Sequence, residues 1–320
     1  MEFSGNNEGI KNEGDPKVLH VIDCVDEGPV ALAALEMARF FNQQSSCKNH
    51  TIVSLLKPSS PGLRRAQGYG VDVDSGSGET FLSYHVRNAD IVQVHLCNTP
   101  SIERFLRLNL GPKRLLIWNY RSGNQSPHFL NEWHKNSADV IVQSHSSCRE
   151  LNFEQCSVSG SKIGKPCLNI PNTINFSNFN IPEKTDSAPF TIGFMGNIAP
   201  HMLSERVVAM NASDNFPECR VLFAGPGNFE FLQNQARLFK KSKRFEFSGL
   251  PASCESFLSQ LDVFFYPVPA NSDGTQDLYL QMAMSAGLPC IVFSHNGLMN
   301  MVVNDYSALI VHSEEEYQEA

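Results

Sequence analysis

Residues 261–292 read LDVFFYPVPANSDGTQDLYLQMAMSAGLPCIV and combine three kinds of local signal in one stretch. The apolar run at Val263–Tyr266 predicts a strand, and the loop after it is rich in Pro, Asn and Gly. The spacing of apolar residues predicts a helix at Gln276–Ala286. A glycine and a proline then precede a second apolar run at Cys290–Phe293. A strand, a helix and a strand in this order are typical of parallel strands joined by a crossover helix.

The same alternation extends from this segment toward both ends of the chain. It begins with a strand at Lys17–Ile22, a loop at Asp23–Pro29 and a helix at Val30–Phe41. Further strands are predicted at His50–Leu55, Ile91–His95, Leu115–Trp118, Val140–Gln143, Phe190–Met195, Arg220–Ala224, Arg244–Ser248 and Ala308–Val311. Further helices are predicted at Ser101–Leu108, Leu203–Ala212, Phe229–Lys240 and Cys254–Gln260. The pattern predicts an α/β protein built from doubly wound parallel sheets.

A chain of 320 residues is long enough for two domains of ordinary size. The periodicity fails between Ile170 and Pro189, a stretch that contains three prolines. We therefore predict a disordered leader at 1–16, a first Rossmann-like domain at 17–175 and a second at 176–320. Such sheets bind ligands at the carboxyl ends of their strands, so the cleft between the two domains is the expected site.

The charge balance argues against a nucleic-acid partner. Lys and Arg number 25 against 33 for Asp and Glu, which gives a formal net charge of −8. One local exception is the basic run formed by Lys240, Lys241, Lys243 and Arg244. It is either the solvated end of a helix, where cations complement the helix dipole, or a peripheral contact with anionic lipid headgroups.

Compartment and metal content follow from what the sequence does not contain. The nine cysteines include no C-x-x-C pair, and no apolar stretch approaches the length of a transmembrane helix. The leader is polar and acidic, unlike a signal peptide. We expect a cytoplasmic protein. No carboxylate cluster has the spacing of a metal site, so we expect none.

Several strings, in order, resemble the retaining GT-B glycosyltransferases of family 4, the glycosyl transferases group 1. The resemblance is carried by LHVIDCVDEGP, ADIVQVH, ADVIVQSHSSCREL and IPNTINFSNF, and above all by the segment quoted first, which is similar to the donor-binding segment of that family. It covers roughly Lys17–Val311. The resemblance implies a GT-B fold, with an acceptor-binding first domain and a second domain that binds the nucleotide sugar.

This family moves a hexose from a nucleotide-diphosphate sugar to an acceptor, which here would be a glycan, a lipid or a small molecule. The nucleotide sugar is a co-substrate, and no further cofactor is implied. Family members usually continue with further helices beyond the position that corresponds to residue 320, so we expect the second domain to be truncated.

The first domain offers four candidate site residues by this resemblance. Gly28 and Pro29 lie where the family has a loop that approaches the phosphates and the acceptor, although a plain tight turn explains them equally well. His95 ends a strand at the expected cleft edge, and a buried, satisfied histidine is its alternative. Arg121 could contact phosphate or acceptor, or pair with a surface carboxylate.

The second domain offers backbone and side-chain candidates for the diphosphate. Asn197 follows a predicted strand at the place of the family's cation pair, which is missing here. Main-chain amides before and within the predicted helix could bind the diphosphate, because a helix N-terminus attracts anions; these residues are Gly274, Thr275, Gln276, Asp277 and Leu278. An ordinary helix cap is the alternative. Gly297 corresponds to a glycine loop of the family.

Departures from the family bear on catalysis. Two glutamates eight residues apart would fall at Gly274 and Met282, and neither position is acidic. If the alignment with the family is shifted by one residue, the two positions fall on Asp273 and Gln281, whose side chains could hydrogen-bond sugar hydroxyls. This shift moves the positions around the helix axis by about 100°. The alternative to an enzyme is therefore an inactive GT-B protein used for binding or assembly. A nucleotide-sugar epimerase is a weaker third candidate.

Overall fold

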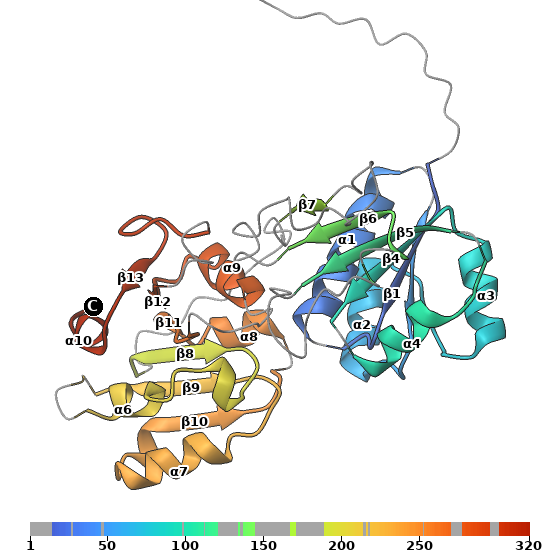
Figure 1. Cartoon of the computed structure of the whole chain (residues 1–320). Coiled ribbons are helices and arrows are strands. Elements are labelled where there is room, and N and C mark those ends of the chain that lie inside the picture. Colours follow the sequence, from blue (N-terminus) through green and yellow to red (C-terminus); the bar gives the residue numbers. More distant parts are fainter. Residues whose placement is uncertain are drawn as a thin grey trace, which may run out of the picture.

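The computed structural model describes residues 15–26, 28–45, 48–97, 99–111, 113–120, 134, 137–144, 167–170, 189–213, 216, 218–251, 253–269, 277–294 and 301–320. In this part of the chain the strands form two separate sheets, each in its own lobe (Figure 1). Every strand pair in both sheets is parallel. The predicted fold class, GT-B with two Rossmann-like sheets, is confirmed.

The first sheet has seven strands in the order β3-β2-β1-β4-β5-β6-β7. They are β1 Val18–Ile22, β2 His50–Ser54, β3 Val73–Ser75, β4 Ile91–Leu96, β5 Arg114–Asn119, β6 Val140–Gln143 and β7 Cys167–Asn169. The helices of this lobe are α1 Pro29–Gln44, α2 Ser60–Tyr69, α3 Glu79–Arg87 and α4 Pro100–Arg107. In the central strands β1 and β4 almost every residue is buried, as expected where a parallel sheet is covered on both faces.

The second sheet has six strands in the order β10-β9-β8-β11-β12-β13. They are β8 Thr191–Met195, β9 Arg220–Ala224, β10 Phe245–Ser248, β11 Val263–Tyr266, β12 Cys290–Phe293 and β13 Leu309–Val311. Its helical segments are η4 Pro200–Met202, α6 Val207–Ala212, α7 Glu230–Leu238, η5 Ser242–Arg244, α8 Cys254–Leu258, α9 Asp277–Ser285 and α10 Glu314–Glu319. The predicted boundary at 175 and 176 lies outside the described residues.

Strand order places the site in each lobe. In both sheets the chain runs outward from a central strand and then returns to that strand's other side, so the order reverses between β1 and β4 and between β8 and β11. Ligands of open parallel sheets bind outside the carboxyl ends of the strands at this reversal. The loops after β1, β4, β8 and β11 are therefore the positions to examine.

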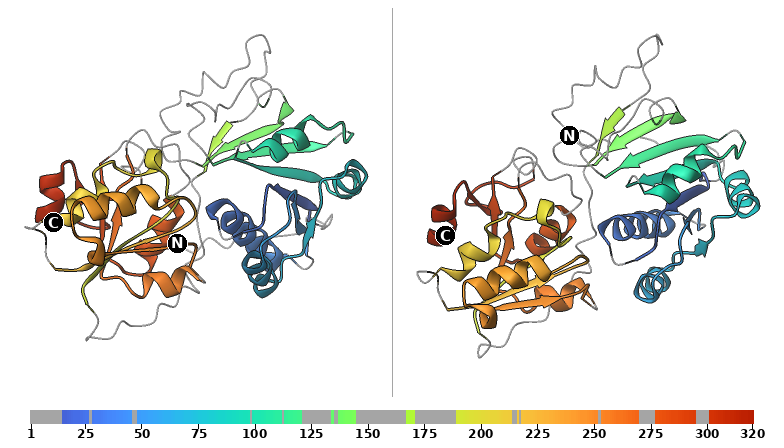
Figure 2. Two further views of the ribbon diagram at one scale, coloured as in Figure 1. Left: turned by 90° about the horizontal axis from the view of Figure 1, so that it is seen from below. Right: turned by 60° about the horizontal axis from the view of Figure 1, so that its bottom comes forward.

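Three apolar clusters account for the core. Helices α3 and α4 cover one face of the first sheet, and α1 and α2 cover part of the other. The largest cluster fills the second lobe and extends to Leu32 and Ala33 of α1 and to Trp118 near the end of β5. Figure 2 shows α1, in blue, on the side of the first lobe that faces the second. Apolar contact thus joins the lobes beside the loops that follow the central strands.

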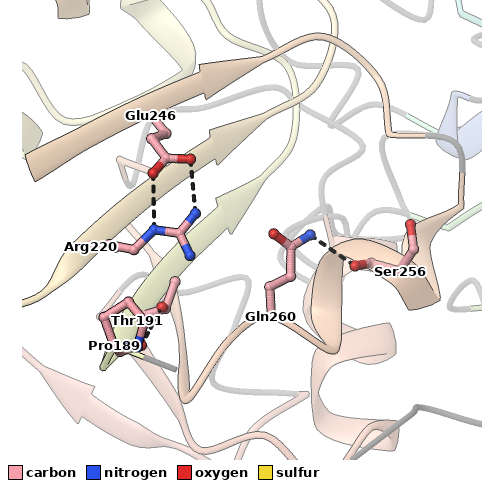
Figure 3. A network of polar contacts seen from close by, with 6 residues as sticks. All are labelled: Pro189, Thr191, Arg220, Glu246, Ser256 and Gln260. Atoms are coloured by element: carbon pink, nitrogen blue, oxygen red, sulfur yellow. Dashed lines mark hydrogen bonds and ion pairs between the residues drawn. The ribbon is translucent and has the colours of Figure 1, made fainter. Parts of the chain in front are cut away.

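A polar network lies in the second lobe near the amino-terminal ends of β8 and β9 (Figure 3). Arg220, at the start of β9, donates two hydrogen bonds of 2.9 and 2.8 Å to Glu246 on β10. Thr191 at the start of β8 donates from its hydroxyl to the Pro189 carbonyl at 2.8 Å. The Arg220–Glu246 pair is largely exposed, so it contributes about 1 kcal/mol at most. The pair joins β9 to β10 at the end of the sheet that is far from the cleft between the lobes.

Most predicted strands and helices exist, with shifted ends. The sequence did not predict α2, β3, α3 or β7, because their apolar spacing is interrupted by glycines and polar residues. The helix predicted at Leu203–Ala212 begins at Val207, after a separate 3-10 turn. The helix predicted to end at Lys240 ends at Leu238, because Lys240 adopts a left-handed φ of 55°. Arg244, which was predicted to begin a strand, belongs to a 3-10 turn, and β10 begins at Phe245.

Thiols and hydropathy give two further observations. Five cysteines whose side chains the structure describes are free thiols: Cys24, Cys97, Cys219, Cys254 and Cys290. Among the helices of the described ranges, none has both the length and the apolar character needed to cross a membrane.

Candidate functional site

A cavity of about 220 Å³ lies where the two lobes meet at the carboxyl ends of their strands. From the first lobe it is lined by Ile22, Asp23, Cys24, Asp26, Gly28, Pro29, Val30, Ala31 and Cys97. From the second lobe it is lined by Asn197, Met202, Pro226 and Tyr279. These residues follow β1, β4, β8 and β9 or belong to α1, η4 and α9. The cavity therefore occupies the position that the strand order predicts in both sheets at once.

The first-lobe wall is the turn between β1 and α1. Gly28 is the N-cap of α1 in an extended conformation, and Pro29 takes the first helical position, which needs no amide donor. No side chain caps this helix, and its first turn contains no acidic residue. Val30 and Ala31, the next residues of α1, also line the cavity, so the cavity lies beside the partial positive charge of a helix N-terminus.

Two carboxylates share this wall. Asp26 accepts a hydrogen bond of 2.7 Å from the Gly28 amide, which fixes the turn, and Asp23 accepts one from the Ser101 hydroxyl. Burial raises the pKa of Asp26; its hydrogen bond from Gly28 opposes this rise, and the neighbouring Asp23 carboxylate adds to it. Carboxylates at this wall accept hydrogen bonds from hydroxyl groups and repel phosphate oxygens. The wall is thus suited to polyhydroxy groups beside the helix N-terminus.

The second-lobe wall consists of two loops joined by backbone hydrogen bonds. The Ile198 amide donates to the Pro226 carbonyl at 2.8 Å, and the Asn228 amide returns a bond of 3.1 Å to the Ile198 carbonyl. The Gly196 amide donates to the Ala224 carbonyl at 3.0 Å. This pairing extends β8 and β9 beyond their ends. It holds the exposed Asn197 side chain and Pro226 at the cavity.

Helix α9 closes the cavity from the second lobe and is almost wholly buried. Tyr279 lines the cavity, although only 1% of it is exposed, and Leu278 is fully buried. Gln281 is also buried, and its side-chain amide lies 3.9 Å from the Met301 sulfur. Met282, where the family would have its second glutamate, is 2% exposed within the apolar cluster. The described part of α9 thus brings a tyrosine to the cavity and no acid.

His95 belongs to a buried row of hydrogen-bonded side chains under α1. Its Nε2 lies 2.9 Å from Nδ1 of His20, and its Nδ1 lies 2.6 Å from the Tyr120 hydroxyl. The Nε2 of His20 in turn lies 2.8 Å from Nδ1 of His50. Gln93, on the same face of β4, lies 3.2 Å from the Met37 sulfur of α1, which places the row beneath that helix. His95 is fully buried and does not line the cavity.

Burial controls the protonation of this row. It lowers the pKa of His95 to about 3 and that of His50 to a smaller extent. The pKa of His20 falls well below its usual value, first through burial and then through the charges of His95 and His50. Burial raises the pKa of Tyr120 well above its usual value, and the adjacent Cys97 adds to this. The row is therefore neutral near pH 7.

The structure brings three of the predicted site residues together. Gly28 and Pro29 from the first lobe and Asn197 from the second line the same cavity. His95, Leu278 and Gln281 are buried outside its lining, so a catalytic role for His95 or Gln281 and a phosphate-binding role for the Leu278 amide stay predictions. The remaining candidates lie outside the described residues or have undescribed side chains; they are Arg121, Asp273, Gly274, Thr275, Gln276, Asp277 and Gly297.

Near Gly28 and Pro29 the sequence reasoning did not single out the neighbouring lining residues, which include Asp23 and Asp26. Elsewhere the cavity residues that it missed are Cys97, Met202, Pro226 and Tyr279. Two of them carried a usable signal. Cys97 directly follows β4, and Pro226 follows β9, so the rule that sites form at strand ends applies to both. Met202 and Tyr279 come from helical segments and carried none. In the part of the chain that the structure covers, no group of three His, Cys, Asp or Glu side chains is placed to hold a metal ion.

Comparisons with known proteins agree with this architecture. Residues 189–320 match the family model of the glycosyl transferases group 1. A search of curated proteins finds no match. Among solved structures, Anabaena HepE in complex with UDP and glucose is similar at a TM-score of 0.75 and 12% identity, over 95% of this chain and 88% of that one.

Two further structures share the fold. A glycosyltransferase from Rickettsia africae has a TM-score of 0.61 at 12% identity, over 94% of this chain and 86% of that one. WaaG, a glycosyltransferase involved in lipopolysaccharide biosynthesis, has a TM-score of 0.62 at 10% identity, over 94% and 88%. The chain therefore has the GT-B fold, and its second lobe matches the glycosyl transferases group 1.

Proposed function

We propose that this protein moves a hexose from a nucleotide-diphosphate sugar to a glycan, lipid or small-molecule acceptor, with retention of configuration and without a metal ion. The observation that carries the proposal is the cavity at the strand-order reversal of both sheets, between the start of α1 and the second-lobe loops. The family match over residues 189–320 and the UDP-bound neighbour support a nucleotide sugar as donor.

The two walls have different chemistry, which suggests how the substrates are divided. The second lobe would hold the donor, with its diphosphate near the start of α9 and the loop of Asn197. The first lobe would hold sugar hydroxyls against Asp23 and Asp26. Charge that develops on the leaving diphosphate would be stabilised by main-chain amides. Asp273, Gln281 and Arg121 remain the candidates for contacts with the reacting groups.

One observation favours an inactive binding protein as the second candidate. Met282 stands where the family has a glutamate, and it is packed in the apolar core of the second lobe, where a carboxylate would be desolvated. Nucleotide binding without turnover of any nucleotide sugar would support this candidate and exclude transfer.

We expect Asn197→Asp to weaken UDP binding by about tenfold or more, because it places a carboxylate at the wall proposed for the diphosphate. Isothermal titration calorimetry with UDP, GDP and ADP measures this directly. The matched control is Asn228→Asp, on the adjoining loop outside the cavity. Its side-chain oxygen accepts a bond of 2.8 Å from the Glu230 amide, and an aspartate can replace it.

The wild-type protein should also gain thermal stability, since a ligand at 100 times its dissociation constant adds about 2.7 kcal/mol. If Asn197→Asp and Asn228→Asp bind UDP with equal affinity, the donor does not bind in this cavity. If none of the three nucleotides binds the wild type, the proposed function is wrong.

A further inference from the structure

An exposed surface at the end of α7 combines cations with apolar side chains. It consists of the exposed residues Arg237, Leu238, Phe239, Lys240 and Lys243, and is called the α7-end patch below. Residues 231–245 contain five Lys or Arg and no Asp or Glu, in a chain whose net charge is −8. The patch is thus a local reversal of the protein's charge.

The apolar part of the patch is unusually exposed. Leu238 is 81% exposed and Phe239 is 46% exposed, and they are consecutive. Leu238 is the most exposed leucine in the described part of the chain. Lys240 and Lys243, which follow them in the chain, are both exposed. A helix end that only needed solvation would have polar residues at these two positions.

The backbone at Lys240 adds an independent observation. The residue has φ 55°, and the Lys241 amide donates to the Ala236 carbonyl at 3.1 Å across it, so it is the left-handed residue that ends the helix. Glycine is the usual residue there, because a side chain in this conformation costs about 1 kcal/mol. The structure records no side-chain hydrogen bond or ion pair for Lys240 among the described residues. The helix dipole favours a positive charge near this end of α7, but it does not require the charge to lie on the left-handed residue itself, where glycine would remove the backbone cost.

We propose that the α7-end patch binds a membrane surface that contains anionic phospholipid. Lysines near such a surface each contribute about 1 kcal/mol, and Leu238 and Phe239 can bury apolar area among the acyl chains. A nucleic acid fits less well, because two large apolar side chains stand among the cations and the whole molecule is acidic. Arg244 is not part of the contact, since it donates to the Asn211 carbonyl at 2.7 Å.

The position of the patch separates this proposal from the nucleotide site. Helix α7 runs back along the sheet between β9 and β10, so its end lies next to the start of β10, at the opposite end of the strands from the loops that follow β8 and β9 (Figure 1). Docking through the patch leaves the cavity accessible. Vesicle binding and UDP binding should therefore be independent, and either can fail without the other.

Co-sedimentation with phosphatidylcholine vesicles, with and without phosphatidylserine, tests the proposal on the full chain. The wild type should bind only the phosphatidylserine vesicles, and high salt should release it. Lys240→Gly should lower the partition coefficient about fivefold while raising the midpoint of thermal unfolding. If Lys240 had only a structural role, Lys240→Gly would raise the midpoint of thermal unfolding without lowering vesicle binding. Leu238→Ser/Phe239→Ser should also lower binding.

The matched control is Arg104→Ala, which removes one positive charge from the exposed side of α4 in the other lobe. It should bind vesicles as the wild type does. The proposal is overturned if Lys240→Gly binds like this control, if neutral vesicles bind equally well, or if the wild type binds single-stranded RNA but no vesicle.

Discussion

Gly225→Ala and Gly227→Ala are each expected to lower the free energy of unfolding by about 3–5 kcal/mol. A Cβ at Gly225 would lie 1.9 Å from the Gly196 carbonyl oxygen, and one at Gly227 would lie 2.1 Å from the Ile198 carbonyl oxygen. Both clashes are with backbone, which cannot rotate away. The two glycines also have φ values of 140° and 130°, which residues with a side chain rarely adopt.

Urea denaturation of the purified variants measures this loss. Gly249→Ala is the matched control, because it lies in the loop after β10 of the same sheet and a Cβ there meets nothing within 4 Å. It should change the free energy of unfolding by about 0.5 kcal/mol or less. Since the glycine-dependent pairing holds Asn197 at the cavity, variants that still fold should also bind UDP more weakly. Equal urea midpoints for Gly225→Ala and Gly249→Ala would contradict the expectation.

The fold could be predicted from the sequence because strand, loop and helix signals repeat in the same order along the chain. The segment around β11 and α9 shows this best, since its strand, helix end and next strand were all located to within a few residues. The start of α7 was predicted to within one residue, but its end was placed two residues too late at Lys240, because a left-handed lysine carries no sequence signal. The strand-end rule located the cleft in general, and the family resemblance singled out Gly28, Pro29 and Asn197 within it.

Individual side chains in the site were harder to predict, for a physical reason. The position of a residue along a strand fixes its face of the sheet, but does not say whether that face opens to the cleft or lies under a helix. His95 was placed at the cleft edge by its position along the chain, yet the strand continues to Leu96 and α1 covers the ring. Only the hydrogen bonds to His20 and Tyr120 show that this polar row is internal.

That internal row predicts a loss of stability in acid. His20, His50 and His95 are neutral in the folded protein because their pKa values lie below that of an exposed histidine, which is about 6.5. The unfolded chain therefore binds more protons at low pH. The stabilising effect of the row is fully present above pH 6.5 and is lost as the pH falls toward the folded value, which is about 3 for His95. Between its folded and its unfolded pKa value, each such histidine lowers the free energy of unfolding by about 1.4 kcal/mol for every unit by which the pH falls.

Urea unfolding between pH 7 and pH 4 should therefore show a steep fall in the free energy of unfolding, and His95→Gln should make that fall shallower. Glutamine keeps a donor and an acceptor but cannot be protonated in this range. The matched variant is Tyr120→Phe, which deletes the hydroxyl 2.6 Å from His95 and leaves all three imidazoles in place. It should lower stability by about 1–3 kcal/mol at every pH while keeping the steep slope. A wild-type slope that matches that of His95→Gln would mean that His95 is already charged in the folded protein, which its burial between His20 and Tyr120 argues against.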